Sequence, residues 1–399
     1  MTTVNKANIE LIYGLSPIQQ GMLFHSLYEP GADVYFEQFS WSFREAIDIQ
    51  LFARAWQYVV QQHPILRTSF HWEELDEPLQ VVHRRVQMPI EQYDWRRLSA
   101  EEQAARLEAF LKADRRRGFE LSKAPLLRLA LIRMGEQEYQ VVWSYHHLLV
   151  DGWSAPLIRG DFLAAYDALR SGRSVSLKAR PPYRQYINWL QQQDLSGAEA
   201  FWRQALKGFT TPTPIYAEPP DPAARGQGDD YAAQQIVLAE AATEGLQALA
   251  RQSRLTLNTL VLGAWALLLS RYSGQEDVVY GATVSGRPPE LPGSESMIGV
   301  FINTLPMRVR VDPQAALGPW LQQLQKQQFE WRQFEYTPLA EIQRWSDGEP
   351  GVPLFKSIVV FENFPSDAAE SRRNIRVFQR TNYPLTLVAE PGAQLLLRL

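Results

Sequence analysis

The sequence predicts a mixed α/β fold, with sheets flanked by helices and two lobes. Three observations lead to this prediction. The 399 residues, 45% of them hydrophobic, suffice for more than one core. Helical and strand-like patterns alternate along the chain, and a similar order of patterns appears in both halves. We therefore expect a first lobe over 1–175 and a second over 176–399.

In the first half, hydrophobic periodicity predicts helices over 16–27, 51–63, 100–111 and 155–172, and strands over 34–43, 66–72, 79–83, 126–133 and 139–147. Ser16 and Ser154 are expected to cap the first and last of these helices. Pro64 and Gly172 stand where helices are expected to end.

In the second half, the same patterns predict strands over 233–238, 277–284, 304–311, 355–364 and 383–390, and helices over 241–253, 258–272, 318–334 and 338–345. The segment 211–230 is rich in Pro, Gly and Asp, and we expect it to form a surface loop.

Composition excludes several classes of function. Forty basic residues against forty-four acidic ones give a net charge of −4, without a block of like charge, so a nucleic-acid partner is not expected. The absence of cysteine excludes disulfides, thiolate metal sites and a cysteine nucleophile. No run of 18 apolar residues and no apolar leader occur, so we expect no membrane insertion and a cytoplasmic location.

All six histidines lie in the first 147 residues, so the first lobe must supply any histidine chemistry. His25 lies within a helical apolar pattern and His63 precedes Pro64, so both are expected to pack or to cap helices. His71 and His83 flank strand ends and are expected to be solvated.

The adjacent histidines His146 and His147 end a predicted strand. Neighbouring strand residues point to opposite faces, so one ring is expected to face a cleft while the other packs behind it. A purely structural alternative is open, in which Asp151 and Gly152 form a turn and both histidines are core residues. A metal site is disfavoured because no second histidine cluster exists. No nucleophile elbow, phosphate loop or dinucleotide fingerprint is present, which favours direct transfer with an imidazole acting on an incoming nucleophile.

The stretch H-H-L-L-V-D-G, residues 146–152, resembles the H-H-x-x-x-D-G motif of the condensation domains of nonribosomal peptide synthetases. Part of this motif, H-x-x-x-D-G, is shared with the wider superfamily of chloramphenicol acetyltransferase. Further stretches resemble the other condensation-domain motifs in their usual order: L-S-P-I-Q-Q-G-M-L-F-H-S-L (15–27), H-P-I-L-R-T-S-F (63–70), P-P-Y-R-Q-Y-I-N-W-L (181–190), V-S-G-R-P (284–288) with I-G-V-F-I-N-T-L-P (298–306), Y-T-P-L-A-E-I-Q (336–343) and P-L-F-K-S-I-V-V-F-E-N-F-P (353–365).

This resemblance implies a V-shaped pair of chloramphenicol-acetyltransferase-like lobes with a tunnel at their junction. His147 would face the tunnel as the catalytic residue, and His146 would pack behind it. Asp151 would hold the loop by pairing with Arg67. Gly152 would leave room for the substrate arms or serve as a turn glycine.

Three further residues are candidates to line the tunnel: Trp153, Ser285 and Asn303. For Ser285 and Asn303 a purely structural role is equally open. The implied reaction is aminolysis of a thioester, in which the α-amine of an aminoacyl group on a carrier protein attacks an acyl thioester. No metal or prosthetic group is expected in the domain, since phosphopantetheine arrives on the carrier protein. The expected partners are that carrier protein and a neighbouring adenylation domain, and we expect a monomer.

The subclass is predicted from finer features. The stretch Q-Q-G-M-L-F-H-S-L-Y-E-P-G-A-D-V-Y-F-E-Q, with D-G-W-S, resembles domains that accept a D-configured donor, or starter domains that acylate the first amino acid. We favour the starter reading, with acyl-coenzyme A as donor in bacterial lipopeptide antibiotic biosynthesis. The alternatives are an elongation domain with a donor on an upstream carrier protein, and a non-catalytic domain that binds carrier proteins. Family members usually continue beyond a segment like 383–399, so we expect the second lobe to be truncated.

Overall fold

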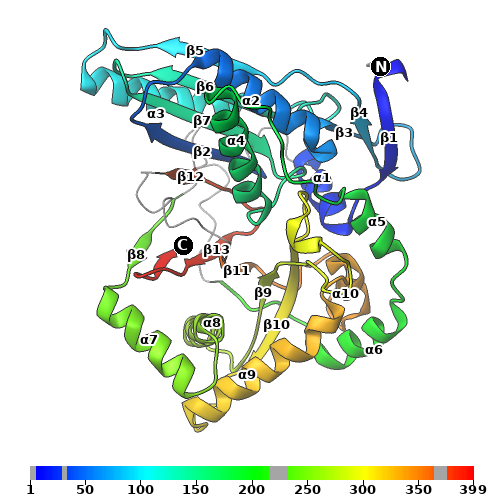
Figure 1. The fold of residues 1–399 in the computed structure, drawn as a ribbon. Helices are drawn as coiled ribbons and strands as arrows, with labels where there is room; N and C mark the ends of the chain where they lie inside the picture. Colours follow the sequence, from blue (N-terminus) through cyan, green and yellow to red (C-terminus); the bar gives the residue numbers. More distant parts are fainter. Residues whose placement is uncertain (1–5, 29–33, 216–231, 364–374) are drawn as a thin grey trace, which may run out of the picture. The chain divides into compact units, whose positions relative to one another are not determined.

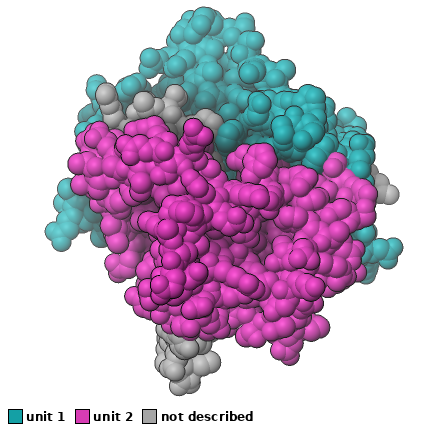
Figure 2. All heavy atoms as spheres, turned by 90° about the horizontal axis from the view of Figure 1, so that it is seen from below, with its two compact units in different colours: residues 1–192, 287–301, 364–382 teal, residues 193–286, 302–363, 383–399 magenta. Residues whose placement is uncertain are grey.

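The computed structural model describes residues 6–28, 34–215, 232–363 and 375–399. The chain forms two compact units, which Figure 2 colours separately. Their residue ranges are Met1–Gln192, Arg287–Phe301 and Phe364–Asn382 for unit 1, and Gln193–Gly286, Ile302–Asn363 and Tyr383–Leu399 for unit 2. The chain thus returns twice to unit 1 from the second half. This division differs from the predicted boundary at residue 175, because both returning segments bond to elements of the first half.

Unit 1 contains two sheets (Figure 1). The five-stranded sheet has the order β12 (Arg376–Phe378), β2 (Phe36–Phe43), β7 (Tyr139–His146), β6 (Leu127–Arg133) and β5 (Ile90–Asp94). The three-stranded sheet has the order β1 (Ile9–Gly14), β4 (Leu79–His83) and β3 (Thr68–His71). Strand β7 pairs antiparallel with both β2 and β6 and is buried along its whole length. The strand that ends in the first of the paired histidines is therefore a central, buried strand of the five-stranded sheet.

The helices of unit 1 are α1 (Pro17–Tyr28), α2 (Ile49–Gln62), α3 (Ala100–Arg117), α4 (Ser154–Arg170) and α5 (Arg184–Gln191). Helices α2 and α4 are joined to β7 by contacts between aromatic rings. The ring of Trp56 on α2 lies 4.7 Å from that of Phe162 on α4 and 5.4 Å from that of Trp143 on β7. Such pairs of large buried rings dominate the energetics of a core. They fix α4, which begins just after the H-H-L-L-V-D-G stretch, against the strand that precedes it.

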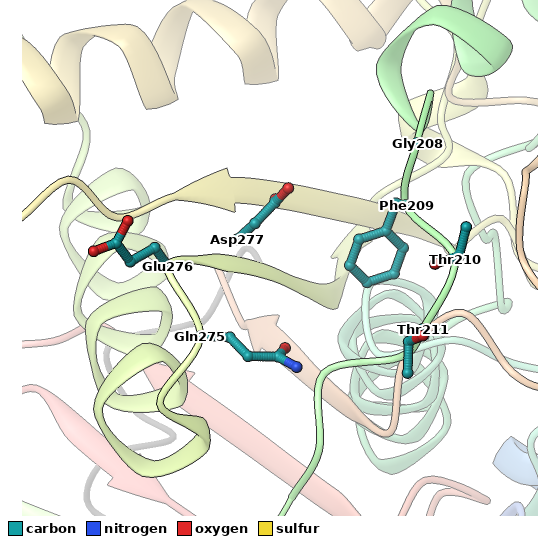
Figure 3. Close-up of a pocket in the computed structure, with 7 residues that line it drawn as sticks. All are labelled: Gly208, Phe209, Thr210, Thr211, Gln275, Glu276 and Asp277. Carbon is teal, nitrogen blue, oxygen red and sulfur yellow. The ribbon is translucent and has the colours of Figure 1, made fainter.

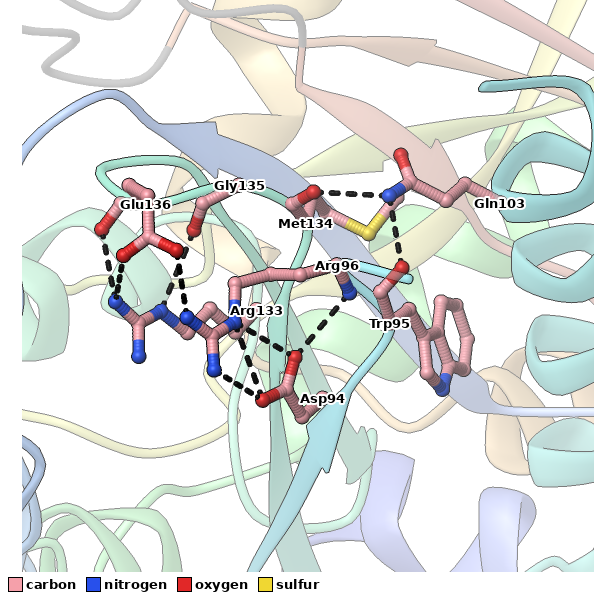
Figure 4. Close-up of polar contacts among 8 residues, drawn as sticks. All are labelled: Asp94, Trp95, Arg96, Gln103, Arg133, Met134, Gly135 and Glu136. Carbon is pink, nitrogen blue, oxygen red and sulfur yellow. Dashed lines mark hydrogen bonds and ion pairs between the residues drawn. The ribbon is translucent and has the colours of Figure 1, made fainter. Parts of the chain in front are cut away.

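The edge strand β5 ends in an exposed cluster of charges (Figure 4). Arg96 lies 2.7 Å from Asp94 and 2.7 Å from Glu136, and Arg133 lies 2.9 Å from Glu136. Hydrogen bonds from the side chain and the backbone N–H of Arg96, together with its charge, lower the pKa of Asp94 to about 2. Charged side chains on an edge strand discourage pairing with another chain. We assign this cluster to the surface rather than to a site.

Unit 2 is built on a six-stranded mixed sheet. Its order is β10 (Asn303–Arg310), β9 (Asp277–Val284), β11 (Ser357–Phe361), β13 (Leu385–Glu390), β14 (Leu396–Arg398) and β8 (Gln235–Val237). The helices are α6 (Ser196–Ala205), α7 (Glu240–Gln252), α8 (Leu257–Ser273), α9 (Leu317–Trp331) and α10 (Leu339–Trp345). Its core contains buried Trp202, Trp265 and Met307.

No single helix among the described residues has the length and hydropathy of a membrane span. The pair α7 and α8 passes that test only when taken together, and it is bent by 103° at the break between the two helices.

The predicted fold class is confirmed: both units are mixed α/β, with sheets flanked by helices. The strand predicted over 66–72 is shorter, because Pro64–Arg67 forms a 3-10 turn and β3 begins only at Thr68. The helix predicted to end at residue 111 continues to Arg117. Helices α5 and α6 and strands β1, β5, β12 and β14 were not predicted. Most of the predicted loop over 211–230 falls outside the described residues.

Candidate active site

His146 is the last residue of β7, where it pairs with Phe36 of β2, and only 5% of its surface is exposed. Its Nδ1 accepts a hydrogen bond from the backbone N–H of Leu148 at 3.2 Å, and its Nε2 lies 3.4 Å from Ser26 Oγ. Burial, with the nearby His147, lowers its pKa to about 3. A neutral ring with both nitrogens so engaged packs against the turn from inside.

His147 follows β7 directly and is partly exposed. Its backbone N–H donates to the carbonyl of Tyr35 at 2.8 Å. Nδ1 of its ring is buried, without a well-formed hydrogen bond to any described residue, so we infer that Nε2 is the nitrogen available to an incoming group. Burial lowers the pKa of His147, and this effect outweighs the opposing influence of its own backbone, of Asp151 and of Val150. A neutral imidazole of this kind accepts a proton.

Asp151 is fully buried and connects the turn to the returning segment 287–301. Its carboxylate accepts from the backbone N–H of Ser154 at 2.8 Å and from that of Phe301 at 3.0 Å. Its own N–H donates to the carbonyl of Gly299 at 3.2 Å. Asp151 thus binds the first backbone N–H of α4, while Ser154, predicted as the cap of this helix, is its first residue and Trp153 holds the cap position. The hydroxyl of Ser154 instead donates to the Gly299 carbonyl at 3.0 Å and accepts from the Gly299 N–H at 3.2 Å.

The prediction that Arg67 pairs with Asp151 is wrong, because the arginine that binds Asp151 is Arg287. Arg287 Nη2 lies 3.2 Å from Asp151 Oδ1, and the two side chains are 3% and 0% exposed. Arg67 instead lies 2.8 Å from Glu10 and also binds the carbonyl of His83. Arg67 is the last residue of the 3-10 turn, and its side chain joins β1 to β4, so its guanidinium is already used within the three-stranded sheet.

Arg287 also holds the segment to which it belongs. Its Nη1 donates to the carbonyls of Ser294 and Met297 at 2.5 and 3.0 Å, and its Nη2 donates to Ser154 Oγ at 2.9 Å. Its guanidinium stacks 4.0 Å from the ring centre of Phe301. Burial lowers its pKa, and Asp151 opposes that shift. Arg287 belongs to the motif V-S-G-R-P, from which Ser285 rather than Arg287 is predicted as a site residue.

Arg180 and Tyr183 also bind the returning segment 287–301. Tyr183 donates from its hydroxyl to the carbonyl of Val300 at 2.6 Å. The ring of Tyr183 lies against Gly299 so closely that a Cβ at that position would come within 2.1 Å of it. Arg180 reaches the carbonyl of Ser296 at 3.3 Å and pairs with Asp161 at 2.8 Å. Glycine at position 299 is therefore needed for a close approach, not for an unusual backbone angle.

The remaining candidates have structural contacts. Trp153 donates from Nε1 to the carbonyl of Glu295 at 2.9 Å, and Gly152 is a partly exposed turn residue beside it. Ser285 is exposed just beyond β9. The amide of Asn303 donates to the carbonyls of Glu335 and Thr337, each at 2.8 Å, and so holds that loop of unit 2.

Other histidines of the described residues also have polar partners: His63 pairs with buried Asp161 at 2.8 Å, and the Ser69 hydroxyl lies 3.0 Å from His71 and 2.8 Å from His83, so the last two are not simply solvated as expected. No group of three or more His, Asp or Glu side chains in that part of the chain is arranged to hold a metal ion. A shallow hollow of about 450 Å³ in unit 2 is lined by Gly208, Phe209, Thr210, Thr211, Gln275, Glu276 and Asp277 (Figure 3). Asp277 there is bound by Arg308 at 2.7 Å. This leaves the turn after β7 as the candidate site.

Comparison with known proteins gives consistent matches. The family model described as "Condensation domain" matches residues 9–398. Linear gramicidin synthase subunits B and C of Brevibacillus parabrevis are each 47% identical to this chain over 98% of its length. The chain spans only 8% and 5% of those two relatives. Surfactin synthase subunit 3 of Bacillus subtilis is 35% identical over the whole chain, which spans 32% of it.

Two solved structures share the fold. The starter condensation domain of rhizomide synthetase, in complex with C8-CoA and Leu-SNAC, superimposes with a TM-score of 0.80 at 22% identity, covering 97% of this chain and 88% of that one. The first condensation domain of the calcium-dependent antibiotic synthetase gives a TM-score of 0.80 at 18% identity, covering 98% of this chain and 91% of that one.

Proposed function

This chain belongs to the condensation domain family, whose members are acyltransferases that form amide bonds in nonribosomal peptide synthesis, and we propose that His147 serves that reaction here. The substrates are an aminoacyl group on a carrier protein and an acyl thioester. The amine nitrogen attacks the thioester carbonyl, a C–N bond forms, the C–S bond breaks, and the amine proton passes through the imidazole to the departing thiolate.

The observation that carries this proposal is the state of His147. Its ring is neutral because burial lowers its pKa, Nδ1 is covered, and the turn that presents it is fixed by the Asp151–Arg287 pair. A neutral imidazole with one accessible nitrogen suits an incoming amine, which needs a hydrogen-bond acceptor that does not add positive charge.

Positioning is expected to dominate over base strength. A free α-amine has a pKa of about 7.7–8.0, so a fraction is neutral near pH 7 without assistance. General-base assistance contributes roughly 10²–10⁴-fold, whereas holding two reactants in attack geometry supplies effective molarities of about 10⁵ M or more. The buried bonds around Asp151 therefore matter as much as the imidazole, because they set where it stands.

The identity of the donor separates two candidate functions. The starter reading, with acyl-coenzyme A as donor, draws support from the fold shared with a starter domain, but at 22% identity that likeness concerns the fold alone. The relatives at 47% identity are elongation-type subunits of linear gramicidin synthase, which favours a donor on a carrier protein. We therefore propose a carrier-bound aminoacyl or peptidyl donor, with acyl-coenzyme A as the second candidate.

The remaining proposals follow from this chemistry. Condensation domains work with carrier proteins and adenylation domains, and we propose that phosphopantetheine reaches this chain only as the arm of its substrates. The proposed thioester aminolysis requires no metal ion. A monomeric state and a cytoplasmic location stay predictions from the sequence.

The test is mass spectrometry of an acceptor carrier protein loaded with an amino acid, after incubation with this chain and either a loaded donor carrier or acyl-coenzyme A. We expect an amide product from the donor carrier and its loss in His147→Ala. His71→Ala, which removes a partly exposed histidine of β3, serves as the matched control and should retain activity. Product from acyl-coenzyme A alone would replace the elongation proposal with the starter one, and no product from either donor would leave a non-catalytic carrier-binding domain.

A further inference from the structure

Tyr35 lies directly before β2, opposite the point where β7 ends. The last residue pair of the β2–β7 ladder is Phe36 with His146. Beyond it, the Tyr35 carbonyl accepts the backbone N–H of His147 at 2.8 Å. The ring of Tyr35 stands edge-on to the ring of His147, with 6.5 Å between their centres. One residue therefore contacts both the backbone and the imidazole of His147.

The backbone of Tyr35 is held in an uncommon conformation. Its φ is 63°, in the left-handed region that residues with a side chain rarely adopt. A conformation of this kind persists only where its surroundings enforce it, and such residues gather at functional sites. Here the N–H of Tyr35 donates to the carbonyl of Arg380 at 3.0 Å, while its carbonyl is bound to His147. These two bonds turn the Tyr35 side chain toward His147.

The side chain of Tyr35 is fixed by a chain of polar groups. It is 9% exposed, and its hydroxyl donates to Asn382 Oδ1 at 2.8 Å. Asn382 Nδ2 lies 3.1 Å from His25 Nε2 on α1, an arrangement in which the amide donates and the imidazole accepts. Partly buried polar groups connected in this way limit each other's freedom. The His25–Asn382–Tyr35 chain thus links α1 to the residue that touches His147.

We propose that Tyr35 is a positioning residue for His147, and that Asn382 and His25 act through it. This inference rests on the proposed role of His147 in amide formation. The hydroxyl of Tyr35 does not reach the substrate in this account. The bond from this hydroxyl to Asn382 holds the Tyr35 ring in place, and the imidazole of His147 packs against that ring. The Tyr35 ring thereby fixes the direction in which Nε2 of His147 points. A displacement of about 1 Å at a reacting group lowers a rate by up to about 100-fold, so a small movement of this ring is enough to matter.

The experiment compares Tyr35→Phe, which keeps the ring and removes only the hydroxyl, with Tyr272→Phe, an exposed tyrosine at the end of α8. We expect Tyr35→Phe and Asn382→Leu each to lower kcat about tenfold with KM for the loaded acceptor carrier changed less than about twofold. His25→Ala should show the same loss, and His25→Gln, which retains an acceptor, should recover most of it. Tyr272→Phe should behave as the unaltered chain.

A second readout does not depend on activity. In the chain labelled with ¹⁵N-histidine, the ring signals of His147 are assigned by their absence in His147→Ala, and they should shift in Tyr35→Phe but not in Tyr272→Phe. Unchanged ring signals in Tyr35→Phe would overturn the inference, even if kcat fell, because the loss would then be merely structural. If the His147 ring signals shift in Tyr35→Phe but His147→Ala retains full activity, the proposed role of His147 is refuted, and with it any catalytic consequence of Tyr35. Shifted ring signals with an unchanged kcat in Tyr35→Phe would also overturn the inference.

Discussion

The pairs Asp151–Arg287 and Asp94–Arg96 are both contacts between an aspartate and an arginine in unit 1. The Asp94–Arg96 pair is the shorter, at 2.7 Å against 3.2 Å, but its side chains are 54% and 34% exposed. Water and salt screen an exposed pair, and its side chains lose entropy in forming it. The side chains of Asp151 and Arg287 are 0% and 3% exposed, so neither charge has water as an alternative partner. Burial rather than distance therefore identifies the pair whose loss should matter.

The two pairs also differ in what they connect. Asp94 and Arg96 are two residues apart, so their contact adds nothing to the long-range organisation of the chain, and only the bond to Glu136 reaches further. Asp151 and Arg287 are 136 residues apart, and they tie a segment from the second half of the sequence to the turn that presents His147. The loss of the buried pair should thus affect both stability and catalysis.

The largest effect is expected from Asp151→Ala. This change leaves the guanidinium of Arg287 buried without its counter-charge, and breaking a buried pair from one side costs about 3–5 kcal/mol. The free energy of unfolding, measured by urea denaturation, should fall by that order, and amide formation should be lost. The matched variant Asp94→Ala should leave both nearly unchanged. Equal losses in the two variants would show that burial does not distinguish the pairs.

The next effect is expected from Gly299→Ala. A Cβ at position 299 would lie 2.1 Å from Tyr183, which is itself fixed by its hydrogen bond to Val300. Overpacking of this kind costs about 1–3 kcal/mol, and the returning segment would move away from Asp151. Urea denaturation measures the loss. Gly318→Ala, at a position where a Cβ meets no atom within 4 Å, is the control and should be no less stable than the original chain.

A pH effect is expected from His146, whose pKa in the fold lies at about 3. In the unfolded chain His146 has its ordinary pKa of about 6.5, so between pH 6.5 and 3 the unfolded chain binds a proton that the folded chain does not. The contribution of neutral His146 to stability is therefore fully present above pH 6.5 and is lost as the pH falls toward 3. The free energy of unfolding should decline by up to about 1.4 kcal/mol per pH unit in this window from this one group. In His146→Gln the decline should be shallower, as measured by urea denaturation at several pH values. An identical slope would mean that His146 is not held neutral.

The smallest effect is expected from Asp94→Asn. Arg96 holds the pKa of Asp94 at about 2 in the folded chain. The stability that this contact contributes is therefore present above the ordinary pKa of an aspartate and is lost as the pH falls toward 2. Because the group is exposed, the thermal unfolding midpoint at neutral pH should stay within experimental error. A clear drop would show that the charged edge of β5 contributes more than its exposure allows.

The sequence predicts the features that depend on neighbours along the chain, and it fails where distant segments meet. The buried strand that ends at His146, just before His147, has a clear apolar pattern, and the turn at Asp151 follows from local composition. The partner of Asp151 does not, because many arginines are available and the pairing depends on a crossing from 136 residues away. The family resemblance supplied Arg67, which the three-stranded sheet uses for Glu10.

Short elements were missed for a related reason. Strand β12 has only three residues and pairs with β2 across more than 300 positions, so it has no periodicity of its own. Tyr35 was overlooked because its importance depends on a backbone angle and on Asn382, neither of which leaves a sequence pattern. Residues that act through long-range contacts need coordinates to be found.

The central claim is that Asp151 is held by Arg287, and that this pair fixes the turn carrying His147. The most direct test is a pair of double-mutant cycles on the free energy of unfolding, with Asp151→Asn combined with Arg287→Met in one cycle and with Arg67→Met in the other. We expect a coupling energy of about 2–3 kcal/mol for Asp151 with Arg287 and less than about 0.5 kcal/mol for Asp151 with Arg67. A strong coupling to Arg67 and none to Arg287 would contradict the account.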